Sequence, residues 1–151
     1  IGITWEDPPA SEAPFDSRFY HGRKTDGTLI PISLTDVNEV DDDGKAILDE
    51  DGNQLVTLGL KTARINRTKE TAHSLLAKTD WYVTRKAEDG TAIPTNVANY
   101  RAAVRTACAN IETSIKNAAN HAAFVALFNV PLDSNGKPTG NAPVHDWPDE
   151  L

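Results

Sequence analysis

A run of apolar side chains at helical spacing between residues 95 and 117 constrains this chain more than any other feature of its sequence. Six of them recur every three or four positions, which places them on one side of a helix: Val97, Tyr100, Val104, Cys108, Ile111 and Ile115. Proline tolerates the missing donor at a helix N-terminus, so Pro94 suits a helix start. The pattern predicts a helix from Thr95 to Asn117, about 34 Å long at ~1.5 Å per residue, with this stripe buried.

The flanking sequence predicts further helices. Residues 62–79 carry Ile65, Ala72, Leu75 and Leu76 on one face. Residues 81–88 follow the capping pair Thr79-Asp80 as a short helix, and residues 121–128 make a last one. We therefore expect a helical domain over residues 61–128.

The sequence before this domain has the signature of short strands joined by tight turns. Asp-Gly dipeptides at 26–27, 43–44 and 51–52 suit the positive φ of hairpin turns. The runs between them, at 29–34, 45–48 and 53–60, are strand-like. Residues 25–60 are thus predicted to form a small β-meander, too small to be stable without the helices or a partner.

The two ends of the chain are rich in proline. Pro8, Pro9 and Pro14 exclude a helix interior, so residues 1–24 are predicted to be an extended arm, and residues 129–151 an extended strap held by Val144 and Trp147. The overall fold class is therefore α+β. The aromatic residues of the arm either pack on the chain itself or dock on another subunit. The predicted partner-binding residues are Trp5, Phe15, Phe19, Tyr20 and Trp147.

Composition narrows the classes of partner. The formal net charge of −7 and the sequence pI of about 5.0 argue against binding to nucleic acid or to an anionic membrane. No stretch approaches the ~20 apolar residues of a membrane span. Cys108 lies on the helix stripe, where we expect a buried, unreactive thiol. The chain has no Met, so either leading residues have been removed or the sequence is a fragment.

One acidic loop has the spacing of a calcium site. With Gly44 at the sixth position of a calcium loop, the candidate ligands are Glu39, Asp41, Asp43 and Glu50. However, the first position is Glu instead of Asp and the flanks are strand-like, which favours an acidic hairpin tip. The four His are scattered, and no nucleophile–base pattern accompanies them. We expect no catalytic residues, no cofactor and no metal.

Residues 75–107 resemble the C-terminal helical region of tail fibre assembly proteins and related tail-fibre-associated proteins of tailed bacteriophages. Those families show Leu-Leu, Thr-Asp-Trp, a Pro, and Tyr-Arg followed by an apolar residue and Arg, and they often end in Trp-Pro. The matching positions are Leu75, Leu76, Thr79, Asp80, Trp81, Pro94, Tyr100, Arg101, Val104 and Arg105, with Trp147-Pro148 near the end. The first half resembles proteins encoded near tail-fibre genes of phages that infect aquatic bacteria such as cyanobacteria.

The resemblance implies a non-enzymatic phage protein that works through subunit contacts. We expect a virion component of the tail, at a fibre, baseplate or fibre attachment, made in the host cytoplasm and present as a homo-oligomer beside other tail or fibre subunits. The alternative is a tail fibre assembly chaperone that is absent from the mature particle. A small calcium-binding domain at residues 39–50 is the remote alternative.

Overall fold

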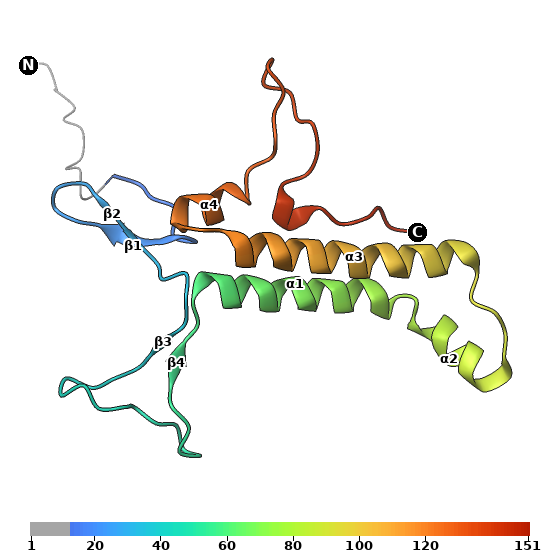
Figure 1. Cartoon of the computed structure of the whole chain (residues 1–151), viewed down its shortest axis with the longest axis horizontal. Coiled ribbons are helices and arrows are strands. Elements are labelled where there is room, and N and C mark those ends of the chain that lie inside the picture. Colours follow the sequence, from blue (N-terminus) through green and yellow to red (C-terminus); the bar gives the residue numbers. More distant parts are fainter. Residues whose placement is uncertain (1–12) are drawn as a thin grey trace, which may run out of the picture. The chain divides into compact units, whose positions relative to one another are not determined.

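A computed structural model describes residues 13–151 of the chain and divides it into two compact units, residues 1–60 and 61–151 (Figure 1). The first unit contains two small antiparallel sheets of two strands each. The second contains the helices. The predicted α+β class is confirmed, and so is the order of β structure before helices.

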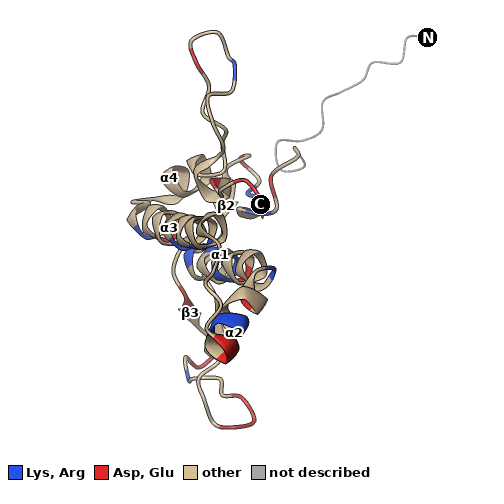
Figure 2. Cartoon of the chain, turned by 90° about the vertical axis from the view of Figure 1, so that its right-hand side faces the viewer, with Lys and Arg blue, Asp and Glu red and all other residues tan. Residues whose placement is uncertain are grey.

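Two antiparallel helices form the body of the second unit, α1 (Leu60–Ala77) and α3 (Thr95–Asn117). Figures 1 and 2 both show them side by side. Hydrogen bonds join them at opposite ends: Lys61 Nζ donates to the carbonyl oxygen of Lys116 over 3.0 Å, and Arg101 donates to that of Leu76 over 2.9 Å. The predicted bounds of α3 are confirmed.

The apolar stripe of α3 is the core of this unit. Five of its six residues are buried: Val97, Tyr100, Val104, Ile111 and Ile115. The expectation of full burial is wrong for Cys108, which is partly exposed. On α1, Ala72 lines the same groove as Cys108, and its side chain is too small to cover the thiol. An open groove therefore remains beside Cys108.

The remaining elements of the second unit are short. Helix α2 (Asp80–Asp89) ends at Gly90, whose φ of 77° is in the left-handed region that glycine adopts readily. Helix α4 (His121–Ala126) begins at Asn120, whose side chain accepts the Ala123 N–H over 2.9 Å. A 3-10 helix spans Pro143–His145.

The C-terminal strap is held against the helices as predicted. Val144 is fully buried, and Trp147 packs against the cluster of Ala72, Tyr100 and Val104. Arg64 of α1 donates to the carbonyl oxygen of Val144 over 2.7 Å. The strap is not extended throughout: a bridge between Leu132 and Pro138 closes a hairpin, because the Asp133 carboxylate caps its turn.

The first sheet of the described part of the first unit is a hairpin of β1 (Tyr20–Arg23) and β2 (Leu29–Pro31). The prediction of an extended arm over residues 1–24 is therefore wrong for Tyr20–Arg23, because the turn before Thr28 brings residues 29–31 back into pairing. Arg23 secures the hairpin by donating to the carbonyl oxygen of Gly27 over 2.8 Å. Residues 1–12 lie outside the described part of the chain.

Beyond this hairpin, three two-stranded ribbons meet at one point. The first pairs β3 (Val37–Asn38) with β4 (Val56–Thr57), and the others are hairpins over residues 40–46 and 48–54. At the meeting point the backbone N–H of Glu39 donates to the carbonyl oxygen of Leu55 over 2.9 Å. The N–H of Leu55 donates to that of Ile47 over 2.8 Å, and the N–H of Ile47 donates to that of Glu39 over 3.0 Å. Gln54 Nε2 lies 2.7 to 3.1 Å from the same three carbonyl oxygens. We call residues 37–57 the ribbon junction.

The junction replaces the predicted meander. Residues 45–48 form no strand, and the predicted strand at 53–60 is reduced to Val56–Thr57. The reason is an eight-residue repeat: residues 39–46 and 47–54 each have an apolar second position, Asp at the third, and Asp-Gly at the fifth and sixth. Each repeat turns back on itself and returns to the meeting point instead of continuing a sheet.

Candidate interaction surface

The predicted partner-binding residues lie in different environments. Trp5 is outside the described residues. Phe15 is 40% exposed, whereas Phe19 is only 3% exposed. Tyr20 is half-buried in β1, and Trp147 of the strap is half-buried against α1 and α3. Packing within the chain thus accounts for Phe19 and Trp147, and a partner role for the others stays a prediction.

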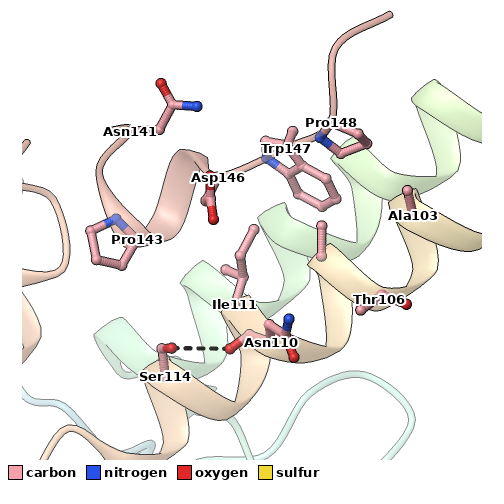
Figure 3. A pocket seen from close by; sticks show the side chains of 11 residues that line it. Ala103, Thr106, Asn110, Ile111, Ser114, Asn141, Pro143, Asp146, Trp147 and Pro148 are labelled. Atoms are coloured by element: carbon pink, nitrogen blue, oxygen red, sulfur yellow. Dashed lines mark hydrogen bonds between the residues drawn. The ribbon is translucent and has the colours of Figure 1, made fainter. Parts of the chain in front are cut away.

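Trp147 also borders a groove between α3 and the strap, of about 570 Å³ (Figure 3). Figure 3 shows its ring over α3, with Ala103, Thr106 and Asn110 along the helix side of the groove. Asp146 lines the strap side. The lining mixes small, amide and carboxylate side chains, and no pair in it has the geometry of a nucleophile with a base.

The most exposed aromatic side chain of the helical unit is on α2. Trp81 is 52% exposed, and no residue of α2 is buried. The Arg85 guanidinium lies 4.8 Å from the ring centroid of Trp81 and 5.5 Å from that of Tyr82. Trp81 and Arg85 share a helix face because they are four residues apart. We call Trp81, Tyr82 and Arg85 the α2 patch.

A small hollow of about 240 Å³ adjoins the α2 patch. Tyr100 lines it, and its buried hydroxyl has no hydrogen-bond partner in the described part of the chain. Lys78 and Glu150 also line the hollow and form an ion pair of 2.7 Å. The hydrogen bond to Glu150 raises the pKa of Lys78, so the Lys78 ammonium stays charged at neutral pH. The hollow therefore combines the apolar side chains of Trp81, Tyr82 and Leu151 with the buried Tyr100 hydroxyl, a donor without a partner in the described part of the chain.

Arg101 holds α2 at a defined angle to the helical body. Its guanidinium donates to the Leu76 carbonyl oxygen, to Thr79 Oγ1 over 2.7 Å and to Asp80 Oδ1 over 2.9 Å. These acceptors lie in the last turn of α1, at the residue that precedes α2 and at the first residue of α2, and the Arg101 side chain is only 13% exposed. A contact surface on a fixed element loses little conformational freedom on binding. The hydrogen bonds of Arg101 thus make the α2 patch a preorganised surface.

Two of the candidate calcium ligands, Asp41 and Glu39, accept hydrogen bonds within the ribbon junction. Asp41 Oδ1 accepts the N–H groups of Asp43 and Lys45, over 3.1 and 2.9 Å, so it caps a hairpin turn. Glu39 Oε1 accepts the Thr57 hydroxyl. Over residues 13–151, no group of three or more His, Cys, Asp or Glu side chains is placed to hold a metal ion.

Comparison of the chain with protein-family models, curated proteins and solved structures finds no match. Among the described helices, none is long and apolar enough to cross a membrane. The partner-binding residues predicted from the sequence include no residue of the α2 patch. The signal was present: the segment from Asp80 to Asp89 has no apolar stripe to bury, so its Trp and Tyr are left for the surface.

Proposed function

We propose that this chain is a non-enzymatic structural protein of a phage tail, held in the virion through contacts with other tail or fibre subunits. The observation that carries the proposal is the α2 patch. A Trp, a Tyr and an Arg lie together on a helix that buries none of its residues. These three residue types dominate the binding energy of protein interfaces.

The position of the patch in the chain adds support. It falls within residues 75–107, the segment that resembles tail-fibre-associated proteins, and it includes Trp81 of the Thr-Asp-Trp motif. The residues of that motif differ in environment: Thr79 and Asp80 accept hydrogen bonds from Arg101, whereas the Trp81 side chain is exposed. Because Thr79 and Asp80 help to orient the helix that carries the exposed Trp81, the motif suits a docking role.

The test is mass spectrometry of purified particles of the phage that encodes this chain. We expect the chain in finished virions. The variant Trp81→Ala should enter particles about thirtyfold less than wild type, because truncating an interface Trp costs ~2 kcal/mol or more. Val83→Ala on the same helix is the matched control, since Val83 is 41% exposed and outside the patch.

Two results would contradict the proposal. If fibres fail to assemble without the chain although finished particles lack it, the chain is an assembly chaperone. If Trp81→Ala enters virions as wild type does, the α2 patch is not the contact. Equal cellular levels of both variants show that any difference arises at assembly and not from loss of folding.

A further inference from the structure

One face of the ribbon junction exposes three large apolar side chains that no described part of the chain covers. Strand residues alternate between faces, and bridge partners share one. Val40 is bridged to Ala46, and Leu48 lies two positions after Ala46, so Val40 and Leu48 share a face. Val56 is paired with Asn38, which lies two positions before Val40, so Val56 shares that face too. Each of the three ribbons thus contributes one of these residues. They are 53%, 53% and 41% exposed. We call these three residues the junction face.

The surroundings of the junction face are strongly acidic. The two hairpin tips carry six exposed carboxylates, and one lysine accompanies them (Figure 2): Asp41, Asp42, Asp43, Asp49, Glu50, Asp51 and Lys45. Two such faces would repel each other across a contact. A surface that covers the junction face must therefore be apolar in its centre and basic at its rim.

The helical unit has such a surface in the groove between α1 and α3, of about 370 Å³. Ala72, Leu76, Cys108 and Ala109 form its apolar part, and its cations are Lys69 and Arg105, beside His73 and a single carboxylate, Glu112. Residues 1–60 hold 13 carboxylates and 4 Lys or Arg, whereas residues 61–151 hold 9 and 11. The acidic and basic surfaces thus belong to oppositely charged parts of one sequence.

We propose that the junction face of one copy docks in the α1–α3 groove of a second copy. Such a contact joins two different surfaces, so each pair leaves one junction face and one groove free to continue into a ring or a filament. The inference rests on the proposed function, since it names one of the subunit contacts that a tail protein would use. It is tested on the purified full-length chain, so its failure would leave the virion test untouched.

The first measurement is the mass of the wild-type chain by light scattering over micromolar to millimolar concentrations. The mass should rise with concentration, and added salt should reverse the rise because salt screens exposed charges. Leu48→Ser should weaken association about tenfold or more, since it removes a large apolar contact. Its matched control is Leu132→Ser: Leu132 is 59% exposed and precedes the same kind of Asp-capped turn in the other unit.

The second measurement identifies the groove as the other half of the contact. Arg105→Glu should prevent association, whereas Arg67→Glu, an exposed α1 position outside the groove, should not. A mixture of Leu48→Ser and Arg105→Glu chains should form pairs that grow no further. Each pair then uses the one intact junction face and the one intact groove that remain between the two variants.

The thiol of Cys108 reports on the groove directly. It is the only cysteine and lines the groove, so an aromatic disulfide reagent should modify it more slowly in associated wild type than in Leu48→Ser. A wild-type chain that stays monomeric over the whole range would overturn the proposal and assign the junction face to another partner. Association that Leu48→Ser and Arg105→Glu leave unchanged would overturn it equally.

Discussion

Cys108 shows how local charge sets the chemistry of one side chain. Burial raises the pKa of its thiol above the usual value, and the nearby Glu112 carboxylate raises it further. Sγ donates to Glu112 Oε1 over 3.6 Å, an interaction that only the neutral thiol makes. The neutral form therefore persists to higher pH than for a free cysteine. The predicted lack of reactivity stays a prediction, and the predicted full burial is wrong because the side chain is partly exposed.

Glu112→Gln should make Cys108 more reactive at a fixed, mildly alkaline pH. The substitution removes a negative charge that opposes the thiolate, so the thiol pKa falls and the thiolate fraction rises. The measurement is the pH profile of the modification rate, made at a concentration where the chain is monomeric. Glu70→Gln, an exposed position on α1 outside this groove, is the control and should leave the profile in place. An unmoved profile for Glu112→Gln would mean that burial alone sets the pKa.

Val104 tests the core at the same scale. It is fully buried on the α3 stripe, so Val104→Asp places a carboxylate where it has no partner, at a cost of about 3 kcal/mol or more. We expect loss of the helical circular dichroism signal at temperatures where wild type is folded. Val83→Asp makes the same chemical change at an exposed α2 position and should melt close to wild type. Equal melting of the two variants would contradict the assignment of α3 as the core.

At the scale of elements, the chain repeats one device, a hairpin turn capped by an Asp carboxylate. Asp41, Asp49 and Asp133 each accept the N–H groups two and four residues ahead, and a glycine with positive φ completes each turn. Such turns depend on residues close in sequence. They explain why residues 37–57 are ordered although none of them is buried.

Gly59 joins the ribbon junction to the rest of its unit and has no room for a side chain. An added Cβ would lie 2.3 Å from the carbonyl carbon of Thr35. Gly59→Ala should therefore destabilise this region by about 1–3 kcal/mol. Hydrogen exchange should quicken at the Leu60 N–H, which donates to Ser33. Gly22→Ala is the control, since nothing lies within 4 Å of its added Cβ, and slow exchange in both variants would refute the close approach.

At the scale of the whole molecule, the two units differ in how they are stabilised. The helical unit buries a continuous apolar stripe, whereas residues 13–60 of the first unit bury Phe19 and Gly59 and leave most of their large apolar side chains exposed. Opening free energies follow buried contacts. The isolated chain should thus have a stable part and a weak part.

Native-state hydrogen exchange of the monomer should separate these parts. Amides in the middle of α3 should exchange slowest, and those of the ribbon junction should exchange faster by orders of magnitude, because local opening there exposes little apolar surface. Association should slow the junction amides without changing the ranking within α3. Uniform protection over both units would show that they unfold as one.

The sequence by itself determined the helices, because their signals are local. The stripe on α3, the proline before it and the apolar positions of the strap need only the period of a helix and the burial of apolar side chains. The Asp-Gly dipeptides likewise predicted tight turns from local sequence alone. The eight-residue repeat of the junction was also in the sequence, but its meaning depends on hydrogen bonds between residues eight and sixteen positions apart.

Only the tertiary structure decided which aromatic residues stay at the surface. Phe19 and Trp81 are both large and apolar, yet Phe19 is 3% exposed, whereas Trp81 is 52% exposed on a helix that buries none of its residues. Exposure depends on what packs opposite each residue, and distant segments supply that. The same reason left the opening beside Cys108 unforeseen: the stripe of α3 was visible in the sequence, but the small Ala72 facing it became known only from the packing of α1.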